Sequence, residues 1–197
     1  MLLKERLKAY NLILASGSPR RQAFLKLMDL DFEIRLKPVD EVYPNAFKRE
    51  NITDYLSQLK AEPFKKDLKP KDILITSDTI VWHRDKALEK PKDSDHAFEM
   101  IKLLSNDSHE VATSICLTTM NQQITKHAIT KVTFSNLSDE AIKHYIEIAQ
   151  PFDKAGSYGI QEWIGAIGIV SIEGSYNNVV GLPTHLLYET LNSIVST

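Results

Sequence analysis

Hydrophobic positions along the chain alternate between short β-type runs and stretches with helical spacing. Residues 12–15 form a short, uninterrupted apolar run, which is typical of a buried strand. A longer β-forming run covers residues 73–82 and is interrupted in its middle by Asp78. Between the two runs, apolar residues at helical spacing predict a helix over 20–30, and alternation predicts a strand over 32–36.

The rest of the chain continues this interspersed pattern. Thr53 is expected to cap a helix that Pro63 ends or kinks, and Asp93 or Ser94 to cap another. A polar turn at 121–123 lies between two β-type stretches, 110–120 and 124–134, and predicts a hairpin. The last expected elements are a helix over 138–148 stopped by Pro151, a glycine-rich β region, a second glycine-containing loop over 174–183 and a helix over 185–195. Because the hairpin breaks a pure βαβ alternation, the pattern favours an α/β protein with a mixed sheet.

Composition and charge narrow the class of protein. The 197 residues suit one domain or two closely joined lobes, with 43% hydrophobic residues. A formal net charge of −2 disfavours nucleic-acid binding driven by bulk charge. The single cysteine, Cys116, has no basic or histidine neighbour and cannot form an internal disulfide. No signal-peptide pattern or membrane-spanning run is present, so a cytoplasmic protein is expected.

The turn at residues 16–21, Ser-Gly-Ser-Pro-Arg-Arg, is the strongest candidate for anion binding. Ser18 and Pro19 are expected at the N-cap and first position of a helix, directly after a strand. The free backbone N–H groups and the positive dipole end would lie beside Arg20 and Arg21, whose guanidinium groups match phosphate oxygens. The same pattern is compatible with an ordinary capped helix that has a basic first turn.

Acidic side chains provide the second set of candidates. A carboxylate inside a β run, as at Asp78, marks either a metal or catalytic site or a local bond to backbone amides. Glu41 is either a second metal ligand or a solvated turn residue, and Mg²⁺ commonly binds one or two carboxylates plus substrate phosphates. A haloacid-dehalogenase-type phosphatase is disfavoured because Thr76 stands where a second aspartate is needed.

Single basic and polar residues carry weaker signals. Lys60 and Lys90, taken alone, are ordinary surface charges. Residues 153–161 form a loop rich in turn residues, at the end of which Gln161 carries the paired donor and acceptor that suit a base edge.

Seven segments, in this order, resemble the Maf family of nucleoside triphosphate pyrophosphatases. They are residues 16–21, 40–41, 60–61, 77–79, 89–91, 153–161 and 174–183. The resemblance covers nearly the whole chain and implies one domain over 1–197. The implied fold is an elongated mixed β-sheet flanked by helices, similar to inosine triphosphatase, with the active site in a central cleft between two lobes.

The resemblance also implies an activity: hydrolysis of dTTP and UTP between the α and β phosphates, in a house-cleaning role. The residue after the proline, the residue after the aspartate and the glutamine of Tyr-Gly-Ile-Gln are similar to those of the dTTP/UTP group rather than the 7-methyl-GTP group. The implied cofactor is a divalent cation, Mg²⁺ or alternatively Mn²⁺ or Co²⁺. The implied roles are catalysis by Asp78 and Lys90, substrate binding by Ser16, Ser18, Arg20, Arg21, Lys60, Thr79 and Gln161, and metal binding by Asp78 and Glu41.

Two departures from the family pattern and two rival functions accompany this resemblance. Ser77 replaces a common alanine, and Pro63 falls where the family usually continues its helix, which puts the position of Lys60 in question. The main rival is a nucleotide-binding regulator of septum formation with little turnover. An RNA-binding module that uses the two arginines lacks a basic stripe or an aromatic-studded strand. The expected partner is a small-molecule nucleoside triphosphate, with no nucleic acid and no membrane, and a homodimer is implied only by the resemblance to the family.

Overall fold

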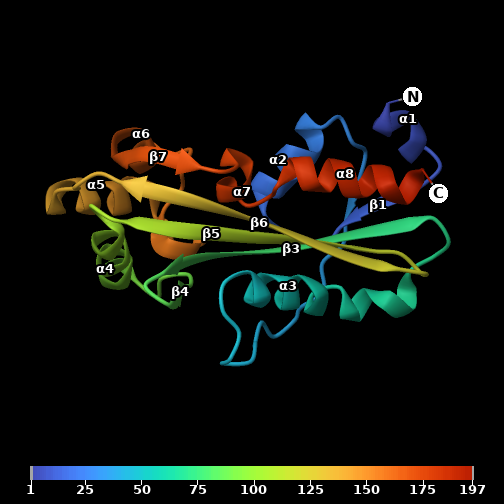
Figure 1. Ribbon diagram of the computed structural model, residues 1–197, viewed down its shortest axis with the longest axis horizontal. Helices are drawn as coiled ribbons and strands as arrows, with labels where there is room; N and C mark the ends of the chain where they lie inside the picture. Colours follow the sequence, from blue (N-terminus) through green and yellow to red (C-terminus); the bar gives the residue numbers. More distant parts are fainter. Residues whose placement is uncertain (1, 197) are drawn as a thin grey trace. The chain divides into compact units, whose positions relative to one another are not determined.

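A computed structural model describes residues 2–196, which form a mixed sheet flanked by helices (Figure 1). The sheet order is β2-β1-β3-β5-β6-β7, and β4 pairs with β3. The strands are β1 Asn11–Leu14, β2 Glu33–Ile34, β3 Asp72–His83, β4 Lys86–Leu88, β5 Ser108–Thr118, β6 Gln123–Phe134 and β7 Ile169–Glu173. The helices are α1 Leu3–Leu7, α2 Pro19–Leu27, α3 Glu50–Leu59, α4 Ser94–Leu104, α5 Asp139–Ala149, α6 Trp163–Gly168, α7 Tyr176–Val180 and α8 Thr184–Val195, with short 3₁₀ helices η1 Glu62–Asp67 and η2 Ala155–Ser157. The expected mixed α/β class is confirmed.

The chain divides into two compact units. The first contains the residues up to Asp78, then Thr113–Ala128 and the residues from Gly181 onward. The second contains Thr79–Ala112 and Ile129–Val180. The chain crosses from one unit to the other within β3, β5 and β6, so Asp78 and Thr79 are neighbours in one strand but belong to different units.

In the first unit, parallel strands are buried on both faces. β1 pairs in parallel with β2 and with β3, and Ile13 lies opposite Leu74. Because side chains alternate along a strand, Leu12 and Leu14 face one layer of helices while Ile13 faces the other. Strands covered on both faces read as continuous apolar runs, which explains the pattern at 12–15 and 73–75.

The two layers of the first unit differ in composition. On one face, α1, α2 and α8 pack a cluster that contains Leu25, Leu187 and Leu191 together with strand residues. On the other face, η1 contributes Phe64 to a smaller cluster with Ile13 and Leu74. The helix α3 lies on that second side of the strands (Figure 1).

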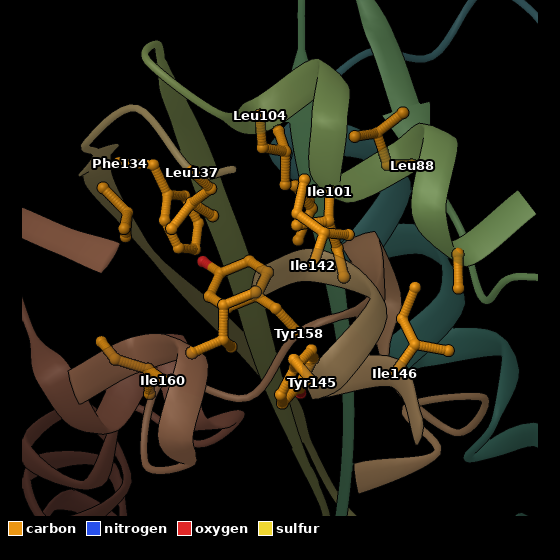
Figure 2. Close-up of a cluster of buried hydrophobic side chains, with 14 of the residues drawn as sticks. Leu88, Ile101, Leu104, Phe134, Leu137, Ile142, Tyr145, Ile146, Tyr158 and Ile160 are labelled. Carbon is orange, nitrogen blue, oxygen red and sulfur yellow. The ribbon is translucent and has the colours of Figure 1, made fainter. Parts of the chain in front are cut away.

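In the second unit, helices α4, α5 and α6 and the 3₁₀ helix η2 surround one large cluster of buried side chains. Figure 2 shows Ile101 and Leu104 of α4 directed toward Ile142 and Tyr145 of α5, with Tyr158 beside them. Tyr158 makes an edge-to-face contact with Phe134, with ring centroids 5.0 Å apart. Burial raises the pKa of the Tyr158 phenol above its ordinary value, and its oxygen is bonded to His109 Nε2 at 2.7 Å.

Most expected elements are confirmed, including the cap at Asp93 and the helix that starts at Ser138. Asp93 accepts a hydrogen bond from the N–H of His96, and Ser138 accepts one from Ala141. The hairpin forms from β5 and β6, with Cys116 buried in β5. The predicted strand over 32–36 shrinks to the two residues of β2.

Other expectations were wrong. The helix expected to start at Thr53 begins at Glu50, and Thr53 lies inside it with its hydroxyl bonded to the carbonyl of Glu50. The region after Pro151 was expected to be β structure, but η2 and α6 precede the single strand β7. The loop expected over 174–183 contains α7. These short helices contain glycine or asparagine, whose low helix propensity makes them hard to predict from the sequence.

Among residues 2–196, no helix combines the length and the apolar character that a membrane crossing requires.

Candidate active site

The turn between β1 and α2 begins the helix at the predicted residues and is closed by a hydrogen bond to Ser16. Pro19 is the first helical residue and Ser18 occupies the N-cap position, where its side chain makes no capping hydrogen bond. Instead, the hydroxyl of Ser16 accepts the N–H of Ser18 at 3.3 Å. Ser16 is buried and closes the turn, and the predicted positions of Ser18 and Pro19 at the start of the helix are confirmed. Arg20 lies half-buried in the first turn of α2.

Arg21 ties this turn to two distant backbone segments. Its guanidinium donates to the carbonyl of Gly181 at 2.9 Å and to the carbonyl of Ser77 at 2.9 Å. A longer contact, 3.4 Å, reaches the hydroxyl of Ser16. Burial lowers the pKa of Arg21, while the nearby Asp78 carboxylate acts in the opposite direction. The side chain therefore braces the backbone immediately before Asp78, and phosphate binding by Arg21 stays a prediction.

Lys60 joins the two predicted metal ligands. Its ammonium nitrogen lies 2.6 Å from Oδ1 of Asp78 and 3.0 Å from Oε2 of Glu41. The Asp78 side chain is 8% exposed, that of Lys60 19% and that of Glu41 50%, so the cluster runs from the buried strand out to solvent. Two carboxylates held on one ammonium carry a net charge of about −1 at neutral pH. The structure thus brings together three residues that lie far apart in the sequence.

The helix α3 places Lys60 through buried polar contacts with the sheet. The hydroxyl of Thr76 donates to the carbonyl of Ser57 at 2.6 Å. The hydroxyls of Thr53 and Ser114 lie 2.6 Å apart in the same layer. The helix ends at Leu59, four residues before Pro63, and Lys60 is its C-cap. Pro63 lies in the first turn of η1 and does not prevent Lys60 from reaching Asp78.

Asp78 and Glu41 supply the oxygen donors that a divalent cation would need. Among residues 2–196, no group of three or more His, Cys, Asp or Glu side chains is arranged around one point. Asp78 and Glu41 nevertheless already share one cation, the ammonium of Lys60. Two carboxylates suffice for Mg²⁺ when substrate phosphates and water complete its six oxygen ligands. The residues present therefore fit a metal that binds together with its substrate.

The remaining predicted residues lie in the second unit. Thr79 is half-buried on β3, Lys90 is exposed between β4 and α4, and Gln161 is exposed in the turn before α6. Their predicted roles stay predictions.

A buried network beside Gln161 was not found by sequence reasoning. The ammonium of Lys154, only 10% exposed, lies 2.8 Å from Asp153 and 3.1 Å from Glu162. The hydroxyl of Tyr145 donates to Glu162 and accepts the N–H of Gly159 at 3.0 Å. Asp153, Lys154 and Gly159 carried a sequence signal through their place in the segment 153–161, whereas Tyr145 and Glu162 lie outside it. Tyr145 belongs to a regular apolar helix face and looks like a core residue.

The comparisons with known proteins agree with this architecture. The structure is similar to that of the Staphylococcus aureus Ham1 protein, with a TM-score of 0.53 over 93% of this chain and 99% of that chain, at 12% identity. A likeness at this identity concerns the fold alone. The fold is thus that of an α/β protein of the Ham1 type.

Sequence comparison identifies the family. Residues 11–194 match the Maf-like protein family, and the chain belongs to it. A protein from Flavobacterium johnsoniae, named dTTP/UTP pyrophosphatase, is 57% identical over 194 residues, which is 98% of this chain and 100% of that protein. A protein of the same name from Christiangramia forsetii is 53% identical over 195 residues, covering 99% of this chain and 100% of that protein.

Proposed function

We propose that the chain hydrolyses nucleoside triphosphates between the α and β phosphates, with dTTP and UTP as preferred substrates. The products are a nucleoside monophosphate and pyrophosphate. The observation that carries the proposal is the Asp78–Lys60–Glu41 cluster, which lies at the end of the first unit's buried strand. Relatives named dTTP/UTP pyrophosphatase match nearly the full length and support the same activity.

Asp78 is proposed as the base that orients and deprotonates the attacking water. The Asp78 carboxylate uses Oδ1 for its contact with Lys60, and a carboxylate has a second oxygen that can accept a proton from water. Asp78 is buried, and Arg21 braces the carbonyl of Ser77 immediately before it. General base catalysis of this kind contributes about 10²–10⁴-fold to the rate.

Asp78 and Glu41 are also proposed to hold a divalent cation when the triphosphate is bound. When bound, a cation such as Mg²⁺ would polarise the phosphate oxygens and favour departure of pyrophosphate. Lys60 would then exchange part of its contact with the carboxylates for a phosphate oxygen, since an ammonium is a compact donor to phosphate. Ser16, Ser18, Arg20, Arg21 and Lys90 are proposed as further triphosphate ligands.

Base selection is proposed for Arg20, Thr79 and Gln161. The uracil and thymine edges carry an acceptor at O4 beside a donor at N3, which a glutamine amide matches with its own donor and acceptor. A 5-methyl group is worth only about 1–3 kcal/mol in a pocket, so both pyrimidines are expected to react.

The test is pyrophosphate release from a panel of common and modified nucleoside triphosphates, with Mg²⁺, Mn²⁺ or Co²⁺ and with a chelator. Fast release from dTTP and UTP that stops on chelation supports the proposal. Release of orthophosphate with a nucleoside diphosphate would exclude α–β cleavage. Nucleotide binding without turnover under any of these conditions would favour the regulator instead.

A further inference from the structure

The turn that carries Gln161 is held from two directions by one buried phenol. The N–H of Gly159 donates to the hydroxyl oxygen of Tyr145 at 3.0 Å, and that hydroxyl donates to the carboxylate of Glu162. Glu162 and Gly159 also close the turn through a backbone hydrogen bond of 3.0 Å. Gln161 lies between these two fixed points, and its side chain is exposed.

The anchor itself is rigid. Tyr145 is fully buried on α5, where Ile142 and Ile146 belong to the same cluster (Figure 2). Burial, and secondarily the hydrogen bond to Glu162, raises the pKa of the Tyr145 hydroxyl, so it keeps its proton and remains a donor. Lys154 contacts the same carboxylate from the other side, at 3.1 Å.

The turn is tightly packed, with no room for a side chain at either of its two neighbouring glycines, Gly159 and Gly165. A Cβ built on Gly159 would lie 2.6 Å from Cδ of Glu162, so the Glu162 side chain folds back over that glycine. A Cβ on Gly165 would lie 2.0 Å from the carbonyl oxygen of Ile160, so α6 packs directly against the turn. The backbone on both sides of Gln161 therefore has little freedom to move.

The rigidity of the turn matters for base recognition because a glutamine amide carries both a donor and an acceptor, whose order is reversed when the amide rotates. Uracil presents an acceptor at position 4 and a donor at N3, and cytosine presents the reverse order. A glutamine that rotates its amide serves either base equally well. Discrimination requires that the amide be held at one position and angle relative to the base.

We propose that Tyr145 is a positioning residue for base selection, because its hydroxyl fixes the backbone on both sides of Gln161. This inference rests on the proposed function, in which Gln161 meets the uracil or thymine edge. The role belongs to the hydroxyl, since a phenylalanine would fill the same volume in the cluster.

The experiment compares Tyr145→Phe with the wild-type chain, using pyrophosphate release from UTP and CTP. The ratio of kcat/KM for UTP over CTP is expected to fall about fivefold or more, the effect of one lost hydrogen bond. The change is expected in KM for UTP, with kcat within about twofold, because Tyr145 does not touch the reacting atoms. Hydrogen exchange of the amides at 159–162 is expected to accelerate, while that of β1 and β3 is unchanged.

Two further variants separate the hydroxyl's role from general loss of stability. Tyr188→Phe removes the hydroxyl of an exposed tyrosine on α8 and is expected to leave the ratio unchanged. Glu162→Ala removes the partly exposed carboxylate end of the network and is expected to lower the ratio even if Tyr145→Phe fails to fold. A ratio within twofold of wild type in both Tyr145→Phe and Glu162→Ala overturns the inference while leaving the proposed function standing. A wild-type chain that releases no pyrophosphate removes the proposed function and this inference with it.

Discussion

Replacing Asp78 by asparagine is expected to separate catalysis from folding. The asparagine oxygen still accepts from Lys60, and Lys60 keeps Glu41 at 3.0 Å as its counterion. The free-energy cost to folding is therefore only the difference between a charge-assisted and a neutral hydrogen bond, about 1 kcal/mol. For a chain of 197 residues, that difference lowers Tm by about 2–4 °C.

The expected effect of Asp78→Asn on turnover is much larger. Loss of a general base lowers the rate by about 10²–10⁴-fold. At 1.36 kcal/mol per factor of ten, this range corresponds to about 3–5 kcal/mol of barrier. The loss of turnover is thus expected to be several times larger, in free energy, than the loss of folding stability.

The assay measures pyrophosphate release from UTP, UTP binding and thermal unfolding for wild type, Asp78→Asn and a matched control. Asp139→Asn is the control, since Asp139 also pairs with a lysine, Lys102, at 2.6 Å but is about half exposed. The control is expected to retain full turnover, and Asp78→Asn to retain binding without it. Wild-type turnover in Asp78→Asn would refute the role of Asp78 as base, and an equal loss in both variants would refute a specific role for the buried pair.

Four other perturbations test the surrounding structure. Arg21→Lys keeps the charge but replaces the two guanidinium nitrogens that donate to Gly181 and Ser77 with a single ammonium nitrogen. Stability is therefore expected to fall by about 1–3 kcal/mol in thermal unfolding, together with turnover, and unchanged values would mean that the guanidinium bridge is dispensable. Thr76→Val leaves the carbonyl of Ser57 without its buried donor and is expected to cost about 1–3 kcal/mol in urea unfolding, and no change would contradict its role in docking α3. Ser77→Ala removes a buried hydroxyl that has no partner within residues 2–196 and is expected to stabilise by about 1 kcal/mol, whereas destabilisation would indicate an unseen partner. Burial lowers the pKa of His109 to about 3, against about 6.5 in the unfolded chain. Between these values the unfolded chain binds the extra proton, so stability decreases as the pH is lowered, by up to about 1.4 kcal/mol per pH unit. The loss of stability between pH 7 and pH 4.5, measured by unfolding, is expected to be smaller in His109→Gln than in wild type.

The sequence predicted the parallel part of the sheet because residues 12–15 and 73–75 are continuous apolar runs, as strands buried on both faces are. The cap at Asp93 and the helix start at Ser138 were predictable because a helix start depends on three or four neighbouring residues. Helices α6 and α7 were missed because tertiary packing overrides their weak local propensity. At Gly165, for example, only the absence of a Cβ lets α6 approach the carbonyl of Ile160.

The sequence singled out the members of the Asp78–Lys60–Glu41 cluster, but not the contacts that join them. Asp78 was conspicuous as a charge inside a β run, Glu41 was a second acidic candidate, and Lys60 gained weight through the family resemblance. Periodicity gives no hint that one ammonium joins both carboxylates, because this depends on the docking of α3 through Thr76. Tyr145 could not be singled out from the sequence, because its ring follows the spacing of core residues and only its hydroxyl contacts the turn.

The bridge made by Arg21 has a consequence for the order in which the protein becomes complete during synthesis. Arg21 and its acceptor Gly181 are 160 residues apart, and the first unit takes its last segment from the residues after position 180. A chain emerging from the ribosome has already exposed Asp78 and Lys60 long before that acceptor exists. Contacts of such long sequence separation form late, because the loop between them must close first. The nascent polypeptide therefore carries the residues of the candidate site, and the Ser77 acceptor of Arg21, without the bond from Arg21 to Gly181 until nearly the whole chain has been translated.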